Sequence, residues 1–302
     1  MAVVGSSVLV SERDSARVLE VAGDGQIREV GVVPGVVHGG EGGLLGLAVD
    51  GDGLFVYSTG ADGNRVERFT LAGGPGGYRL GSAQPVISGL PAAGTHNGGR
   101  IAFGPDGALY VAVGDAGDRP AAQDPGRLHG KILRLNADGS IPADNPRRGS
   151  PVYSLGHRNV QGLAWAADGT MYASEFGQNR WDELNRIVPG GNYGWPVVEG
   201  AGGEDRGFIA PLQTWSTDAA SPSGIAIVGS TILIANLRGR ALRAVPLADP
   251  SASAIHAEGY GRIRDVTIGP DGTVWVLTGN TDGRGDPQPG DDRIISLPVP
   301  PA

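Results

Sequence analysis

One sequence unit recurs six times along the chain, and this repeat limits the possible folds more than any other feature. Each copy is a short apolar strand, a tight turn, a second apolar strand and a loop, and the clearest reads IAFGPDGALYVAVGD over residues 101–115. The copies begin at residues 3, 47, 101, 163, 225 and 266. A segment of alternating apolar and polar residues follows each copy, which is the pattern of a half-buried antiparallel strand. Because four strands need about 40 residues, the repeat predicts an all-β fold, a six-bladed β-propeller of four-stranded antiparallel blades, with the extra residues in loops.

A two-sheet sandwich and a right-handed β-helix are the alternative folds. A sandwich would not repeat the same turn motif six times, and a β-helix has a shorter period, so the propeller is favoured. We expect residues 1–302 to form a single propeller domain. Since the chain begins inside its first unit, we also expect the first blade to be clipped at its N-terminal end.

Glycine and proline make up about a quarter of the chain, with 53 and 22 residues, which excludes a helical bundle. Four Asp-Gly pairs, at 52/53, 106/107, 168/169 and 271/272, are expected to supply the positive φ of two-residue hairpin turns. Gly98, Gly99 and Gly177 lie in longer loops, and we interpret them as glycines that let the backbone approach a cofactor or a metal ion.

Charge and residue usage exclude several classes of function. Acidic residues outnumber basic residues by 32 to 24 and no basic run occurs, so nucleic acid is not an expected partner. No apolar stretch of about 18 residues occurs, so no membrane span is expected. The absence of cysteine excludes disulfides and thiolate metal ligands. The first ten residues do not read as a signal sequence, which leaves a cytoplasmic protein or one whose targeting segment has been removed.

Two loops in equivalent positions carry the candidate catalytic residues. THNGGRI, residues 95–101, places His96 just before the third unit, and GHRNVQG, residues 156–162, places Arg158 and Asn159 before the fourth. A histidine at the mouth of a propeller channel suits general-base work near neutral pH, and a histidine that only satisfies loop hydrogen bonds is the alternative. Arg158 offers a guanidinium fork for a carboxylate or a developing anion, and a plain surface loop is the alternative.

Three further segments contain groups that bind ions. Residues 175–187 combine a glycine turn with acidic residues, an oxygen-rich supply suited to Ca²⁺, and a plain acidic loop is the alternative. Arg262 and Arg264 lie two residues apart and so project to the same side of a strand, where together with Arg238 they would bind a polyanion. Solvated arginines on an edge strand are the alternative. Glu41, in the loop that enters the second unit, is a weak candidate by itself.

Together these strings resemble the soluble quinoprotein sugar dehydrogenases, the aldose sugar dehydrogenase or soluble glucose dehydrogenase family that uses pyrroloquinoline quinone (PQQ). The likeness runs in order over nearly the whole chain, through EGGLLG, HNGGRI, GKILRL with DGSIPADNP, GHRNVQGLA, DELN with GGNYGWP, SPSGIAI and RIRDV. So many ordered matches are more specific than any single motif. The chain is shorter than the glucose enzymes of the family.

The resemblance implies a role for each candidate residue. His96 is the catalytic base and also contacts PQQ. Arg158 and Asn159 are further catalytic residues, which contact the quinone oxygens and the Ca²⁺ region. PQQ is also bound by Arg238, Arg262 and Arg264, and Glu41 contacts substrate and cofactor. The catalytic Ca²⁺ is held by the backbone carbonyls of Gly177 and Gln178, and a second, structural Ca²⁺ is ligated by Glu183 and Tyr193. Arg238 stands where the glucose enzymes have lysine, and Gln178 stands where they have proline. Both changes keep the charge or the carbonyl that the role needs.

The resemblance therefore implies a PQQ- and Ca²⁺-dependent enzyme that oxidises the C1 hydroxyl of aldose sugars to lactones and passes electrons to an external small-molecule or protein acceptor. It also implies a secreted or periplasmic protein. Two alternative functions stay open. One is a Ca²⁺-dependent propeller lactonase, which needs carboxylate and asparagine side chains around an axial metal. The other is a non-catalytic propeller that binds a protein or a glycan.

Overall fold

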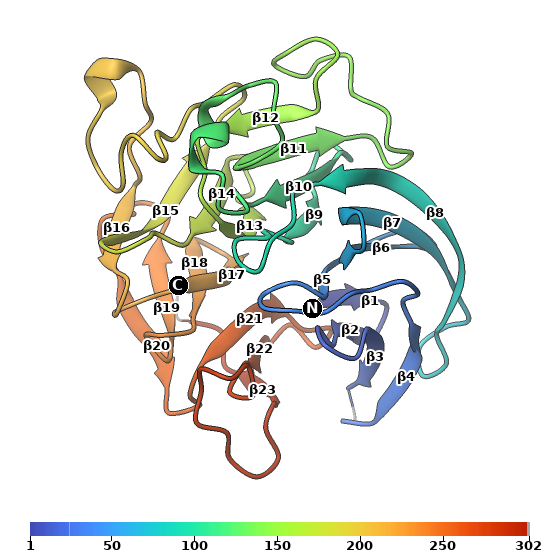
Figure 1. Cartoon of the computed structure of the whole chain (residues 1–302). Helices are drawn as coiled ribbons and strands as arrows, with labels where there is room; N and C mark the ends of the chain where they lie inside the picture. The colour runs from blue at the N-terminus through green and yellow to red at the C-terminus, as the bar shows by residue number, and fades with distance from the viewer. Residues whose placement is uncertain (24, 301–302) are drawn as a thin grey trace. The chain divides into compact units, whose positions relative to one another are not determined.

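The fold is a six-bladed β-propeller, as the repeat predicted. Figure 1 shows the computed structural model, which describes residues 1–23 and 25–300. Six antiparallel sheets follow one another along the chain, and each is built from strands that are consecutive in sequence. Five sheets have four strands, and the last has three in the described part of the chain. No helix among these residues is long and apolar enough to cross a membrane.

The first three sheets belong to one compact unit, residues 1–159 and 188–196. Its elements are β1 (Ala2–Val4), β2 (Ser7–Ser11), β3 (Arg17–Ala22), β4 (Ile27–Val32), β5 (Leu44–Asp50), β6 (Gly53–Gly60), β7 (Gly63–Ala72), β8 (Arg79–Leu90), β9 (Ile101–Phe103), β10 (Leu109–Val113), the 3₁₀ helix η1 (Arg119–Gln123), β11 (Lys131–Leu135) and β12 (Val152–Leu155). Although β1 has only three residues, it pairs with β2, so the first sheet contains four strands.

The last three sheets belong to a second compact unit, residues 160–187 and 197–302. Its elements are β13 (Val160–Trp165), β14 (Met171–Glu175), β15 (Trp181–Ile187), the 3₁₀ helix η2 (Glu204–Arg206), β16 (Gln213–Ser216), β17 (Pro222–Val228), β18 (Thr231–Asn236), β19 (Ala241–Pro246), β20 (Ala254–Glu258), β21 (Ile263–Ile268), β22 (Val274–Thr278) and β23 (Ile294–Leu297).

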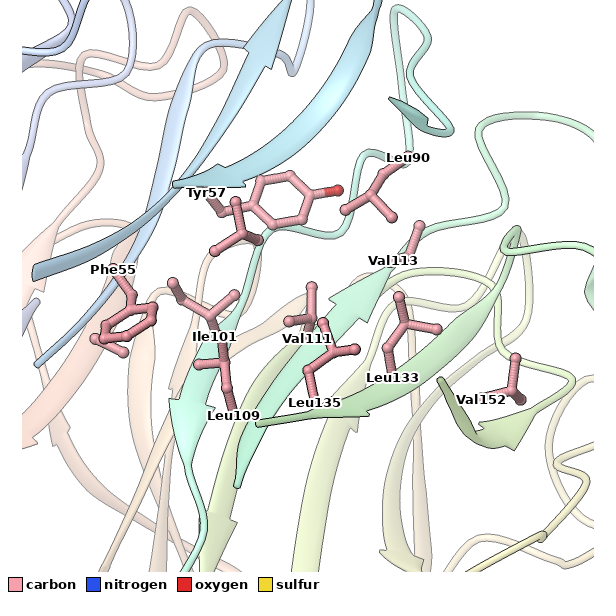
Figure 2. Close-up of a cluster of buried hydrophobic side chains, with 12 residues drawn as sticks. Phe55, Tyr57, Leu90, Ile101, Leu109, Val111, Val113, Leu133, Leu135 and Val152 are labelled. Atoms are coloured by element: carbon pink, nitrogen blue, oxygen red, sulfur yellow. The ribbon is translucent and has the colours of Figure 1, made fainter. Parts of the chain in front are cut away.

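Apolar side chains that alternate along neighbouring strands form the core of each unit. In the first unit Phe55 and Tyr57 of β6 pack with apolar residues of β9, β10 and β11 (Figure 2). Phe55 also meets Phe103 edge to face, with ring centroids 4.9 Å apart. A fully buried side chain of this size contributes about 1.5–3 kcal/mol relative to an exposed one. Burial of this kind, repeated along every sheet, holds the loops that carry the polar residues.

Glycine allows the first strands of neighbouring sheets to approach closely. In the first unit β5 packs against β9, and in the second β13 packs against β17. A Cβ atom on Gly46 of β5 would overlap the carbonyl oxygen of Gly99, and a Cβ on Gly162 of β13 would lie 2.5 Å from the carbonyl oxygen of Ser223. These glycines form a class that the sequence interpretation did not separate from turn and loop glycines.

Most of the Asp-Gly turns are longer than the two residues predicted from the sequence. Those at residues 104–108, 166–170 and 269–273 have five, because the flanking strands first pair at Phe103↔Leu109, Trp165↔Met171 and Ile268↔Val274. In all three turns the aspartate carboxylate accepts the N–H two residues further on, at 2.9–3.2 Å, and the following glycine has a positive φ. The remaining pair is displaced: Gly51 and Asp52 form the two-residue turn, and Gly53 begins β6.

Candidate active site

The backbone of His96 has an unusual conformation in the loop between β8 and β9. Its φ is +57°, a left-handed value that costs a non-glycine residue about 1–2 kcal/mol. Three hydrogen bonds hold this conformation. The His96 N–H donates to the Glu41 carboxylate at 2.9 Å, and its carbonyl accepts the Ala116 N–H at 3.2 Å. The adjoining Asn97 carbonyl accepts the buried Tyr57 hydroxyl at 2.8 Å. The loop is therefore fixed by groups from three different segments.

The imidazole of His96 lies between a carboxylate and a guanidinium. Its Nδ1 is 2.7 Å from Asp115 Oδ1, and its Nε2 is 2.8 Å from Arg158 Nη2. Because a guanidinium can only donate, Nε2 must accept, so the ring proton lies on Nδ1 and is donated to Asp115. His96 is thus arranged as a neutral imidazole whose lone pair is at Nε2, with its side chain 16% exposed.

Asp115 follows the end of β10, and its side chain is fully buried. Besides His96, it accepts the Trp195 indole N–H at 2.8 Å and the Gly117 N–H at 2.9 Å. Burial by itself raises the pKa of a carboxyl, but these three hydrogen bonds outweigh it and lower the pKa of Asp115 below its ordinary value. Asp115 is therefore an anion that fixes the tautomer of His96.

Arg158 and Asn159 join the His96 loop through both side chain and backbone. The Arg158 carbonyl accepts the Asp115 N–H at 2.8 Å, and its guanidinium lies 5.6 Å from the centre of the Trp195 ring. Asn159 is buried, and its Oδ1 accepts the Gly98 N–H at 3.0 Å. The structure thus brings together four of the predicted site residues, Glu41, His96, Arg158 and Asn159, within the first unit.

In the second unit, carboxylates hold the backbone of the loop that begins at Gly177. The Gly177 N–H donates to Asp182 at 2.9 Å, and the N–H groups of residues 178–181 all donate to one oxygen of Glu199, at 2.7–3.3 Å. Within the described residues, no hydrogen bond reaches the carbonyl oxygens of Gly177 and Gln178, and the buried Gln178 Oε1 has no partner either. This loop therefore presents three oxygen atoms that a cation can use.

Two buried glutamates, Glu175 and Glu183, lie opposite each other on neighbouring strands of the same sheet. Glu183 of β15 pairs with Glu175 of β14, and Asn185 Nδ2 donates to both, at 3.1 and 3.4 Å. Burial, together with the neighbouring Glu175, raises the pKa of Glu183 to about 8. Asn185 Oδ1 is buried and has no partner among the described residues. A divalent cation would relieve the repulsion between these carboxylates.

Tyr193, predicted to ligate the same ion as Glu183, lies in the other unit. Its hydroxyl accepts the Val188 N–H at 3.0 Å, and its ring stacks on His157 with centroids 4.6 Å apart. The joint role of Tyr193 and Glu183 therefore stays a prediction. No group of three or more acidic, histidine or cysteine side chains forms a metal cluster within residues 1–23 and 25–300.

Two of the three arginines of the predicted anion site share one carboxylate. Arg262 is 7% exposed, and its Nε and Nη2 lie 3.0 and 2.8 Å from Asp282 Oδ2. Arg264, which is half-buried, reaches the same oxygen at 3.8 Å and Ser223 Oγ at 3.4 Å. The prediction that the two arginines lie on one side is consistent with this, and the alternative of two solvated arginines is wrong for Arg262. Arg238 is exposed and pairs with Asp218.

The glycines interpreted as ligand-facing are explained by the packing of the protein itself. A Cβ on Gly98 would overlap the Ala112 carbonyl oxygen, one on Gly99 would lie 2.7 Å from Leu45, and one on Gly177 would overlap the Trp181 carbonyl oxygen. Packing within the protein therefore already requires glycine at these positions, and the approach of their backbone to a cofactor or a metal ion stays a prediction.

Sequence reasoning missed the partners that orient the candidate residues. Asp115 carries a usable signal, since it is the first charged residue after the apolar run LYVAV. Trp195 lies in the recognised string GGNYGWP but was given no role. Glu199 and Asp282 have no local signal, because each acts on a segment about twenty residues away in the sequence.

Known proteins match this chain over most of its length. A model of the glucose/sorbosone dehydrogenase family matches residues 1–286. The PQQ-bound structure of an aldose sugar dehydrogenase from Streptomyces coelicolor is 48% identical, with a TM-score of 0.92, and the match covers 98% of this chain and 92% of that one.

Two further relatives are less similar in sequence. Aldose sugar dehydrogenase YliI of Escherichia coli is 30% identical, and the match covers 87% of this chain and 81% of the relative. Quinoprotein glucose dehydrogenase B of Acinetobacter calcoaceticus is 34% identical, and that match covers 65% of this chain and 49% of the relative.

Proposed function

The chain belongs to the glucose/sorbosone dehydrogenase family, and on that premise we propose that it oxidises the C1 hydroxyl of aldose sugars to lactones with PQQ as the hydride acceptor. The observation that carries the proposal is the neutral His96, whose Nδ1–H donates to Asp115 and whose Nε2 lone pair accepts from Arg158. Alcohol oxidation needs a proton acceptor of this kind, because the hydroxyl proton must leave as the C1 hydride departs.

His96 takes the C1 hydroxyl proton at Nε2. For this the sugar hydroxyl replaces Arg158 Nη2 as the donor to that nitrogen. The proton converts His96 to an imidazolium, whose charge is stabilised by Asp115 at 2.7 Å. The sugar loses one proton and one hydride, which together are the two electrons and two hydrogens of the oxidation. Arg158, once displaced, keeps its positive charge close to the reaction, where it stabilises developing negative charge.

The residues of the second unit fit a polyanionic cofactor and a hard cation. Arg262 and Arg264 would hold carboxylates of PQQ: they carry two positive charges against the one negative charge of Asp282, and the guanidinium of Arg264 is 34% exposed. Arg238 would add a third cation. When bound, PQQ supplies the quinone that receives the hydride.

Ca²⁺ fits the loop at Gly177 because its oxygen atoms lack hydrogen-bond donors. The carbonyls of Gly177 and Gln178 would hold the ion, which would supply a Lewis acid there. Glu183 would hold a second, structural ion together with Tyr193. The buried carboxylate pair in which Glu183 lies supports a cation on the side of Glu183.

Reconstitution tests the proposal directly. The purified protein with PQQ and Ca²⁺ should reduce an artificial dye in the presence of a common aldose, and His96→Ala should lower the rate at least about 10²-fold without loss of PQQ binding measured by absorbance. Failure with every common aldose would refute the proposal. Lactone hydrolysis without PQQ would instead support the lactonase, and failure to bind PQQ would support a non-catalytic binding domain.

Two further parts of the proposal come from the family alone. Electrons would pass to an external acceptor, either a small molecule or a protein, and the enzyme would work outside the cytoplasm, in the periplasm or as a secreted protein. Detection of the protein in the periplasmic or culture fraction of its native cells would support the location, and its retention in the cytoplasm would contradict it.

A further inference from the structure

Lys131 is the only lysine of the chain, beside 23 arginines, and it is fully buried. It is the first residue of β11 in the first unit. Its ammonium nitrogen lies 3.0, 2.8 and 2.6 Å from the backbone carbonyl oxygens of Ala121, Ala122 and His129. All three ammonium protons can therefore be donated to the backbone of one segment, the residues 121–129 that include the end of η1.

The geometry explains why this position is a lysine in a chain that otherwise uses arginine. An ammonium is a compact charge with three donors that rotate about one bond, whereas a guanidinium is a flat fork of five donors. Three carbonyls around one point match the three donors of an ammonium, whereas a guanidinium there would have donors without acceptors. The site resembles a carbonyl cage for a metal ion, filled by a side chain of the protein itself.

The ammonium remains charged at neutral pH. Burial lowers the pKa of Lys131 to about 8, an effect that Asp124 opposes and Arg127 reinforces. The three carbonyl dipoles also favour the charged form. A buried charge is costly unless it is fully paired, so loss of the amine would leave three backbone carbonyls without their donor.

The cage is connected to the His96 centre by a short series of hydrogen bonds. The Ala122 carbonyl that accepts from Lys131 also accepts the Gly156 N–H at 3.0 Å. Next to it, Gln123 Nε2 donates to the Trp195 carbonyl at 2.7 Å. The Trp195 indole donates in turn to Asp115, at 2.8 Å. Every member of the series belongs to the first unit.

We propose that Lys131 is a positioning residue for the His96 centre: its ammonium ion fixes the end of η1, and η1 through Gln123 fixes Trp195 and so the carboxylate that orients His96. Lys131 touches neither the imidazole nor a reacting atom. Its effect on rate rests on the proposed aldose oxidation, whereas its effect on His96 is a property of the protein without cofactor.

The first test compares two variants of the same strand. Lys131→Met keeps an unbranched side chain of nearly the same length and removes the charge. Arg134→Met is the matched control, because Arg134 is also a buried cation of β11 but pairs with Asp106 and Asp144 instead of the loop at 121–129. We expect Lys131→Met to lower kcat about 10- to 100-fold and to shift the acid limb of the kcat/KM profile. Arg134→Met should lower thermal stability and leave that limb unchanged.

The second test needs no activity. In the protein without cofactor, the NMR titration of the His96 ring nitrogens, assigned with His96→Asn, should shift in Lys131→Met and not in Arg134→Met. Because only one lysine is present, ¹³Cε-lysine labelling gives a single resonance, which should titrate well below the ordinary lysine value of about 10.4.

Three results would overturn the proposal: an ordinary titration of the lysine, an unchanged His96 titration in Lys131→Met, or an equal shift in both variants. Absence of dehydrogenase activity in the wild type would refute the proposed function and leave these NMR results to decide the role of Lys131.

Discussion

Replacement of Asp115 by asparagine should change the tautomer of His96 while the histidine itself is kept. The side chain is fully buried and accepts three hydrogen bonds, from His96, Trp195 and Gly117. Asparagine has nearly the same shape but only one acceptor oxygen and an NH₂ group. If that oxygen keeps the bonds to Trp195 and Gly117, the NH₂ group faces His96 Nδ1. The imidazole must then carry its proton on Nε2, where it can no longer accept one from the sugar.

The magnitude follows from two separate losses. Removal of the charge alone costs the imidazolium a charge-assisted hydrogen bond of about 1.5–3 kcal/mol, which corresponds to about 10- to 150-fold in rate. Inversion of the tautomer costs about 10⁴ in a comparable buried His-Asp pair. We therefore expect kcat of Asp115→Asn to fall between about 10- and 10⁴-fold, the larger value if the tautomer is inverted in every molecule.

The assay is steady-state dye reduction with PQQ, Ca²⁺ and an aldose over a range of pH, together with titration of PQQ binding. Asp118→Asn is the control, because Asp118 lies three residues away and its exposed carboxylate pairs with Arg127 and not with His96. PQQ affinity should be unchanged in both variants. A kcat of Asp115→Asn within about threefold of wild type would refute the assignment of Asp115 as the residue that fixes the His96 tautomer.

Three further predictions concern stability. Burial raises the pKa of Glu199, but hydrogen bonds from four N–H groups outweigh it and lower the pKa, so the carboxylate stabilises the fold above about pH 4.5 and this stabilisation is lost as pH falls through the lowered pKa. Glu199→Gln should lower the free energy of unfolding by about 2 kcal/mol at pH 7. Equal denaturant midpoints for the variant and the wild type would contradict this. Gly46→Ala should cost about 3 kcal/mol because its Cβ overlaps Gly99, whereas Gly74→Ala, which meets no atom within 4 Å, should be nearly neutral in the same unfolding assay. Because the pKa of Glu183 is raised, the stability of the metal-free protein should fall as pH rises from about 4.5 to 8. Glu183→Gln should remove that fall and should also reduce the increase in Tm that Ca²⁺ gives. An increase in Tm as large as in the wild type would exclude Glu183 as a ligand.

The fold could be predicted because the repeat is local. Each unit contains its own strands and turn residues within about fifteen positions, as in residues 101–115. Because the unit occurs six times, a wrong strand assignment in one copy does not change the predicted fold. Turn length was less accessible. Whether Gly107 closes a loop of two or five residues depends on where Phe103 and Leu109 first pair, and that register is decided by packing across the sheet.

The candidate site was predicted in part for a similar reason. His96 and Arg158 lie in polar strings that stand out from the surrounding sequence, and the structure places their side chains in contact. Asp115 was missed although it follows an apolar run, because its role becomes clear only from its partners, and the role of Asp282 has no other signal than its partners. Those partners, Trp195 in one case and Arg262 in the other, are brought close by the fold and not by sequence spacing.

The burial of Lys131 also makes the chain a proteolytic reporter of its own opening. A protease specific for lysine has a single target bond, between Lys131 and Ile132, inside a strand whose five residues are all buried. Arginines elsewhere are not substrates for it. Cleavage into fragments of residues 1–131 and 132–302 can therefore occur only from molecules in which the third sheet has come apart, and the rate of this one cut measures how often that happens.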